Sequence, residues 1–183
     1  MNTQDFILNS TGSSGSQVAA DFPAKVKHSE VLKAPVGFHP FFDLEEGVEY
    51  AKKVNKPILI DFTGHACVNC RKMEDKVWID KEVGRIIKEK YVLIQLYVDE
   101  RNIKMSKDKV HYSEILRTNT DDLGRWNGDF QASKYGSNSQ PFYVLAGHDL
   151  NPLVKPGGAV FEAKQYAAYL QSGVDAFDKK KSD

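Results

Sequence analysis

The organisation of the chain is clearest in Lys56-Pro-Ile-Leu-Ile-Asp-Phe-Thr-Gly-His-Ala-Cys-Val-Asn-Cys-Arg-Lys-Met-Glu-Asp-Lys-Val-Trp78. The run Pro57–Phe62 is short, β-branched and nearly all apolar, which predicts a central strand covered on both faces. Gly64 ends this strand, and Cys67 and Cys70 follow as a Cys-x-x-Cys pair where the helical pattern begins. A buried strand therefore leads into a cysteine pair at the start of a helix.

The segments on either side of this stretch extend the same pattern. The helix from Cys67 to about Lys90 should break around Trp78–Asp80, because Asp80 can cap a second helical piece. A second buried strand is predicted over Tyr91–Val98, parallel to the first, because a strand, helix, strand order implies a right-handed crossover. Upstream, Asp43 begins a further helix in a capping-box pattern with Glu46.

Beyond residue 98 the chain continues to alternate between elements. The sequence predicts an insertion over about 99–120 with a short strand or hairpin, a helix closed by a glycine, a hairpin and a last helix ending near Gly173. The residues that carry these expectations are, in order, Val110–Leu116, Leu123–Gly136, Phe142–Ala146 with Leu153–Val154, and Phe161–Leu170, followed by a solvated tail at Lys179–Lys181.

The N-terminal region lacks this periodicity. Residues 9–16 are small and polar, which is typical of a flexible linker. We therefore divide the chain into a flexible linker or N-terminal extension over residues 1–36 and one folded domain over residues 37–183.

Composition excludes several classes of protein. The 25 basic and 25 acidic residues leave no net charge, so the basic surface of a nucleic-acid-binding protein is missing. The longest apolar runs fall far short of the roughly 18 residues of a membrane-spanning helix. The first residues lack the basic start and apolar core of a secretory signal, which indicates either a cytoplasmic protein or a piece of a longer one.

The two cysteines form the candidate site. A thiol at a helix N-terminus faces unpaired backbone N–H groups and the positive end of the helix dipole, and both favour the thiolate that attacks disulfides. Cys67 would hold that position as nucleophile. Cys70, one turn further on, would attack the mixed disulfide and release the partner protein.

The pair has two other interpretations. Two cysteines three residues apart also occur side by side in buried helix faces. A structural zinc site needs four ligands, but there is no second Cys-x-x-Cys and the histidines show no paired spacing. His65, two residues before Cys67, is expected in the loop near the mouth of the site. The strand-to-helix context favours redox chemistry without metal or organic cofactor, the disulfide itself being the redox group.

The stretch Lys56–Trp78 resembles thioredoxin-like domains, most closely the C-terminal (gamma) domains of DsbD-type thiol:disulfide interchange proteins in a form similar to that of Bacteroidetes. Cys-Val-Asn-Cys followed by Arg-Lys-Met-Glu, the Tyr97-Val-Asp element and Ser139–Val144 carry the likeness. It implies an α/β thioredoxin fold, a central mixed sheet flanked by helices. Unlike thioredoxin itself, the chain has no proline between the cysteines and Ala66, not tryptophan, before them.

The resemblance also implies roles for four further residues. Asp61 matches the buried acid beneath the cysteine pair, and Glu74 matches a second acid of the DsbD domain; both would handle protons. A carboxylate inside an apolar strand is costly unless it is protonated or paired, which favours a functional role for Asp61. Pro141 matches a proline with a cis peptide bond that faces the cysteines, and the Gln140 backbone would pair with the incoming partner segment.

The implied function is that of a protein-disulfide reductase. Negative charge near Cys67 opposes the thiolate, so the two acids favour an electron donor over an oxidant. The domain would be periplasmic and monomeric, tethered to the inner membrane through the linker. It would take electrons from a membrane-embedded domain and pass them to the N-terminal domain of the same protein or to other periplasmic protein disulfides. The alternatives are a stand-alone periplasmic thioredoxin-like protein for cytochrome c maturation or disulfide isomerisation, and a non-enzymatic metal-binding or adaptor domain.

Overall fold

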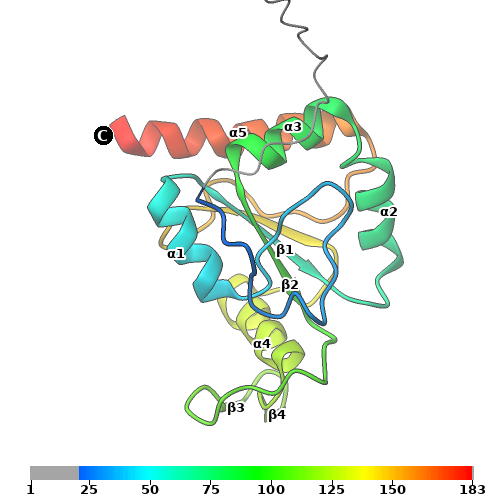
Figure 1. The fold of residues 1–183 in the computed structure, drawn as a ribbon, viewed down its shortest axis with the longest axis vertical. Helices are drawn as coiled ribbons and strands as arrows, with labels where there is room; N and C mark the ends of the chain where they lie inside the picture. Colours follow the sequence, from blue (N-terminus) through cyan, green and yellow to red (C-terminus); the bar gives the residue numbers. More distant parts are fainter. Residues whose placement is uncertain (1–20, 183) are drawn as a thin grey trace, which may run out of the picture.

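A computed structural model describes residues 21–182 of the chain, and a mixed sheet lies at its centre (Figure 1). The sheet comprises β1 (Ile58–Thr63), β2 (Val92–Tyr97) and β5 (Phe142–Ala146) in the order β2-β1-β5. β1 runs parallel to β2 and antiparallel to β5. The predicted mixed sheet is therefore confirmed, and every residue of β1 is buried as a central strand requires.

The crossover between β1 and β2 contains two helices, α2 (Val68–Lys76) and α3 (Lys81–Lys90). The Asp80 side chain accepts hydrogen bonds from the backbone N–H groups of Glu82 and Val83, so it caps α3. The predicted helix break at this point is confirmed. Its consequence is that α2 is a short, separate helix whose N-terminus lies directly after β1.

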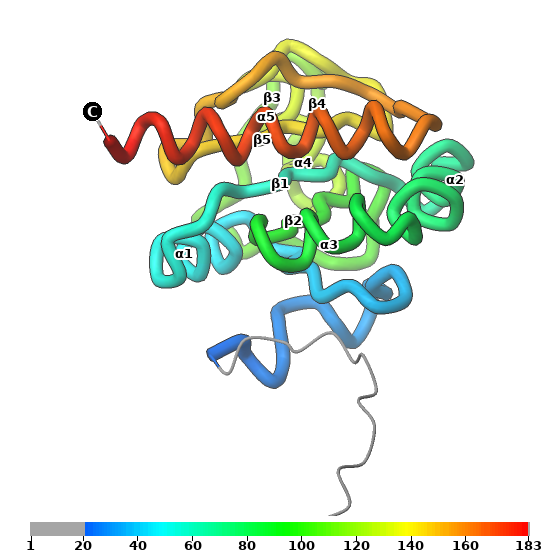
Figure 2. The backbone as a smooth tube through the Cα atoms, turned by 90° about the horizontal axis from the view of Figure 1, so that it is seen from above, coloured from blue at the N-terminus to red at the C-terminus, as the bar shows by residue number. Residues whose placement is uncertain are grey.

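Helices cover both faces of the sheet. α1 (Leu44–Val54) and α4 (Leu123–Tyr135) pack on the face formed by the even-numbered residues of β1, while α3 and α5 (Ala163–Ser182) lie side by side on the other (Figure 2). The predicted starts of α1 and α4 are confirmed, with Asp43 and Asp122 as N-caps. No helix among residues 21–182 has both the length and the apolar character needed to cross a bilayer.

The predicted insertion contains one small hairpin. β3 (Tyr112–Ser113) and β4 (Thr118–Asn119) pair antiparallel at the end of the molecule beside α4 (Figure 1). The rest of residues 99–120 is irregular, as the polar sequence indicated. The insertion lies between the end of β2 and the start of α4.

The N-terminal boundary predicted from the sequence was wrong for residues 21–36. Val26 and Leu32 are buried in the core beside α1, and Phe22 packs against Phe41. The backbone N–H of Lys27 donates to a carboxylate oxygen of Glu46 over 3.0 Å. These apolar side chains lack periodicity because the segment consists of turns, from which single side chains reach the core. The predicted Ser/Gly linker at residues 9–16 lies outside the described residues.

Two predictions for the C-terminal part also need correction. The predicted hairpin partner of β5 at Leu153–Val154 is not a strand. Residues 152–157 pair with β5 at isolated bridges, those of Pro152 and Gly157, because Pro152 and Pro156 lack the N–H groups that a paired strand uses. The last helix does not end near Gly173 but runs on to Ser182, so Lys179–Lys181 belong to its last turns. Gly173 is instead a packing position, since the side chains of Tyr91 and Leu145 occupy the space that a Cβ would need.

Candidate functional site

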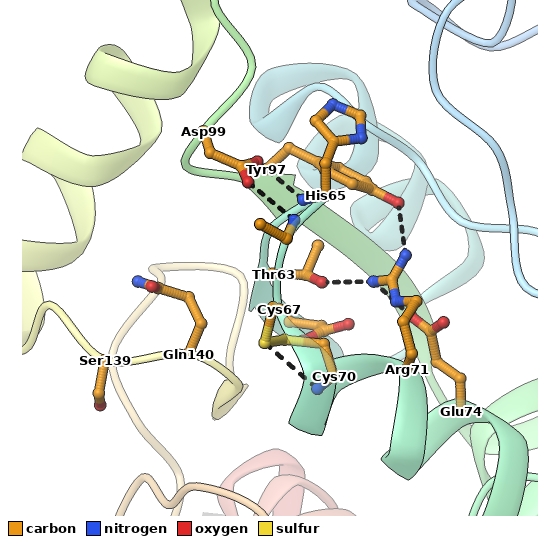
Figure 3. The surroundings of a disulfide bond; sticks show 12 residues. Thr63, His65, Cys67, Cys70, Arg71, Glu74, Tyr97, Asp99, Ser139 and Gln140 are labelled. Atoms are coloured by element: carbon orange, nitrogen blue, oxygen red, sulfur yellow. Dashed lines mark hydrogen bonds and ion pairs between the residues drawn. A yellow bond between two sulfur atoms is a disulfide. The ribbon is translucent and has the colours of Figure 1, made fainter.

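The two cysteines form a disulfide at the N-terminus of α2 (Figure 3). Cys67 is the N-cap residue, and its Sγ accepts a hydrogen bond from the backbone N–H of Cys70 over 3.2 Å. Cys70 is only 1% exposed, whereas Cys67 is half-buried. Cys67 is therefore the more accessible sulfur of the pair, and a negative charge on it would lie at the helix N-terminus.

The backbone before Cys67 is held by Asp99 and Glu100, which follow the end of β2. The Asp99 carboxylate accepts hydrogen bonds from the N–H groups of His65, at 2.9 Å, and Ala66, at 3.2 Å. Gly64 allows this close approach, because a Cβ there would lie 2.9 Å from an Asp99 oxygen. The His65 ring lies in the loop as expected, and its Nε2 is 2.9 Å from a carboxylate oxygen of the buried Glu100. Asp99 and Glu100 thus fix the loop that presents Cys67.

Asp61 lies in the middle of β1 and is fully buried. Its Oδ2 accepts a hydrogen bond from Gln95 Nε2 over 3.0 Å, and its Oδ1 has no hydrogen-bond partner. Burial raises the pKa of the Asp61 carboxyl to about 7, the neighbouring Glu74 raises it further, and the Gln95 hydrogen bond opposes the shift. Asp61 can therefore take up or release a proton near neutral pH.

Glu74 lies four residues after Cys70 on the buried side of α2. Its Oε1 is 3.0 Å from Arg71 Nη2 and accepts a hydrogen bond from Gln95 Nε2 over 3.2 Å. Burial raises the pKa of Glu74, while the Arg71 charge opposes the rise. Because Gln95 contacts both Asp61 and Glu74, the two predicted acids belong to one buried network beneath α2.

Gln140 and Pro141 lie on the loop before β5, and the peptide bond between them is cis, as the resemblance implied. Gln140 and Cys67 line the same pocket of about 360 Å³, together with Val68, Asn69 and Asp99 among others. Gln140 lies across this pocket from Cys67 (Figure 3). The structure therefore brings Cys67 and Gln140 to one surface and places Asp61 and Glu74 in the interior below.

Sequence reasoning missed the residues that connect these groups. Gln95 joins the two acids, and Arg71 Nη2 donates to Thr63 Oγ1 over 2.8 Å besides pairing with Glu74. Gln95 carried a usable signal, since it interrupts the apolar run Val92–Tyr97 as Asp61 interrupts the apolar run Pro57–Phe62. Arg71 carried none, because a basic residue on a helix is ordinarily solvated.

Part of the chain is similar in sequence to known proteins. Residues 39–116 match the family model described as thioredoxin-like. Mouse spermatogenesis-associated protein 20 is 29% identical over 86 residues, which make up 47% of this chain and 10% of that protein. The chain thus spans about a tenth of the length of this curated relative.

Solved structures show the same fold. The DsbH oxidoreductase superposes with a TM-score of 0.54 at 18% identity, over 79% of this chain and 91% of that one. The reduced C-terminal domain of Neisseria meningitidis DsbD gives 0.50 at 15% identity, over 71% and 93%. A thioredoxin from Thermus thermophilus gives 0.50 at 14% identity, over 72% and 84%. The sheet and the flanking helices therefore have the arrangement of a thioredoxin fold.

Proposed function

Because the chain contains a thioredoxin-like domain with a Cys-x-x-Cys disulfide, we propose that it is a protein-disulfide reductase in which Cys67 is the nucleophile and Cys70 the resolving thiol. The observation that carries this assignment is the asymmetry of the pair. Cys67 is accessible at the helix N-terminus, and Cys70 is buried one turn further on. Only the first sulfur can meet a partner disulfide, and only the second is left to resolve it.

The reaction has two exchange steps. The Cys67 thiolate attacks one sulfur of the partner disulfide, forms a mixed disulfide, and the other partner sulfur leaves as a thiolate. Cys70 then loses its proton and attacks Cys67 Sγ, so that the Cys67–Cys70 bond forms and the bond from Cys67 to the partner breaks. The partner gains two electrons, and the domain is left oxidised.

Asp61 is the proposed acceptor of the Cys70 proton. It lies beneath α2, connected through a single side chain, Gln95, to Glu74 on the turn after Cys70. A carboxyl whose pKa is about 7 is half-ionised at neutral pH, so it can both accept this proton and return it in the next cycle. Asp61 needs burial for that role, since an exposed aspartate is ionised at neutral pH and holds no proton.

The direction of electron flow follows from the same acids. A buried negative charge near the pair disfavours the Cys67 thiolate and the reduced state that depends on it, which makes the dithiol the better donor. Arg71 offsets part of this effect, because it neutralises Glu74. We assign the domain as a reductant.

Gln140 and Pro141 are proposed to bind the partner chain. The Gln140 backbone would pair with an extended segment that carries the partner disulfide, in the manner of an added strand. This placement is supported by the pocket that Gln140 shares with Cys67.

The resemblance to DsbD-type gamma domains supplies the specific form of the proposal. Electrons would come from a membrane-embedded partner domain and pass to periplasmic protein disulfides, with the domain tethered in the periplasm. A stand-alone thioredoxin-like protein is the alternative. Reduction by a purified DsbD-type membrane domain, compared with reduction by NADPH and thioredoxin reductase, separates these two electron sources.

The cysteine roles are tested by trapping. Cys70→Ser leaves the nucleophile but removes the resolving thiol, so incubation with an oxidised protein substrate should accumulate a mixed disulfide. The matched variant Cys67→Ser should accumulate none, because Cys70 is buried. Equal trapping by both variants, or trapping through Cys70 alone, would contradict the assignment. A stoichiometric bound metal in the purified protein would favour a metal-binding domain instead.

A further inference from the structure

Arg71 and Gln95 belong to the buried network but neither exchange electrons nor carry the proton in the proposed reaction. Building on the proposed reductase function, we propose that Arg71 and Gln95 are positioning residues that assign different tasks to the two buried carboxylates. Arg71 holds Glu74 in its ionised form. Gln95 fixes Asp61 next to Glu74 without supplying charge, so that Asp61 alone exchanges a proton with the cysteine pair.

Arg71 forms an ion pair with Glu74 and hydrogen bonds with two residues of the sheet. Its Nη2 lies 3.0 Å from Glu74 Oε1 and donates to Thr63 Oγ1 over 2.8 Å, while Nη1 donates to the Tyr97 hydroxyl over 3.4 Å. One guanidinium thus ties α2 to the ends of β1 and β2 (Figure 3). Arg71 makes no hydrogen bond or ion pair with Asp61 in the described part of the chain, so it contacts Glu74 directly and lowers the pKa of Asp61 only through its charge at a distance.

Gln95 supplies Asp61 with a neutral partner. Gln95 is the register partner of Asp61 in the parallel β1/β2 pair, and it is fully buried. Both of its amide hydrogens are used, one for Asp61 at 3.0 Å and one for Glu74 at 3.2 Å. An amide orients both carboxylates but cannot neutralise either, and an unneutralised carboxylate in the interior favours its protonated form.

Two buried oxygens without hydrogen-bond partners also indicate that Asp61 and Glu74 have different roles. Asp61 Oδ1 and Gln95 Oε1 are buried acceptors without a donor among residues 21–182. Buried polar atoms are seldom left without a partner. A proton on Asp61 would make its carboxyl a donor beside the unpaired Gln95 oxygen, whereas Glu74 already has the Arg71 guanidinium at its Oε1.

The remaining ionisable groups around the acids do not change this charge balance. Burial raises the pKa of each tyrosine that faces the network, so these phenols stay neutral near pH 7. Asp75, also on α2, adds a like charge next to Glu74. The groups concerned are Tyr97 on β2, Tyr143 on β5, Tyr166 on α5, and Asp75 and Cys70 on α2. Arg71 is therefore the cation of this network.

The test follows the carboxyl carbons of the oxidised full chain by ¹³C NMR from pH 4 to 9. In the wild-type protein one buried carboxyl, Asp61, should titrate near pH 7, with Glu74 ionised well before it. Arg71→Met leaves two buried acids without a cation, so the Glu74 midpoint should rise by at least about one pH unit. Arg71→Lys should restore most of the wild-type curve. Gln95→Met should raise both midpoints.

The control is Arg85→Met, which removes the exposed Arg85–Glu82 pair with the same spacing on α3. It should leave both midpoints unchanged. If Arg71→Met does not fold, Arg71→Gln keeps a donor for Thr63 while removing the charge, and the same shift is expected. An unmoved Glu74 midpoint, or a shift confined to Asp61, would overturn the inference. The roles of the cysteines are tested independently by trapping with Cys70→Ser, so this result would leave their assignment unchanged.

Discussion

Asp61 links the stability of the domain to its chemistry at the scale of a single residue. Its carboxyl is fully buried, receives one hydrogen bond from a neutral amide and has a pKa raised to about 7. The folded state therefore binds a proton that the unfolded chain, with an ordinary aspartate, releases near pH 4. The property proposed to serve proton transfer is thus also a source of instability above neutral pH.

Asp61→Asn should remove this pH dependence. Between about pH 4 and 7 the native wild-type carboxyl is protonated and the unfolded one is not, so the free energy of unfolding falls as pH rises. A shift of about three pKa units corresponds to at most about 4 kcal/mol. The asparagine variant should be the more stable protein at pH 8 and nearly equal at pH 4, as measured by urea unfolding of the oxidised forms. A wild-type stability that rises over this range would contradict the assignment.

The sequence could predict some residues of the buried network but not others. Asp61 was predictable because a carboxylate stands out in an apolar strand. Gln95 was open to the same argument, but only the parallel register reveals that the two side chains meet. The pairing of Arg71 with Glu74 depends on how α2 rotates over the sheet, and the sequence pattern does not specify that rotation.

At the scale of elements, Gly173 explains why α5 was predicted too short. Glycine commonly ends a helix, and a sequence pattern cannot distinguish that use from close packing. Here α5 passes through Gly173 without interruption, with Leu145 Cδ1 2.6 Å from the place of a Cβ and the Tyr91 hydroxyl nearby. The strand and helix starts around β1, α2 and α3 were predictable because local caps and apolar runs determine them.

Gly173→Ala should destabilise the domain by about 1–3 kcal/mol, because the new methyl group has to displace Tyr91 or Leu145. Gly128→Ala in α4 is the matched control, since a Cβ there meets only Leu116 Cδ1 at 3.7 Å. That substitution should stabilise by up to about 1 kcal/mol through helix propensity. Chemical denaturation of the two variants measures the difference, and equal effects would refute the packing role of Gly173.

At the scale of the whole molecule, residues 21–36 are part of the folded domain. Leu32 is 1% exposed and Val26 7%, both in the core cluster shared with α1 and the sheet. The sequence alone could not reveal this, because turns that bury only single side chains have neither helical nor strand periodicity. The layered architecture was predictable, since the order of strands and helices admits few topologies.

Leu32→Ala should lower the free energy of unfolding by about 2–4 kcal/mol, as expected for a buried leucine. Val36→Ala, four residues on and 98% exposed, should change it by less than about 0.5 kcal/mol. Urea unfolding of both variants separates an integral segment from a loosely attached one. A negligible effect of Leu32→Ala would show that residues 21–36 belong to the linker and not to the folded domain.

The measurement that tests the central claim most directly is the reduction potential of the Cys67–Cys70 pair. It is obtained by equilibration with a dithiothreitol redox buffer, followed by alkylation and mass analysis. A reductant should give a potential near or below the roughly −270 mV of thioredoxin. A value near the roughly −120 mV of a strong oxidant would contradict both the assigned direction of electron flow and the role given to the two buried acids.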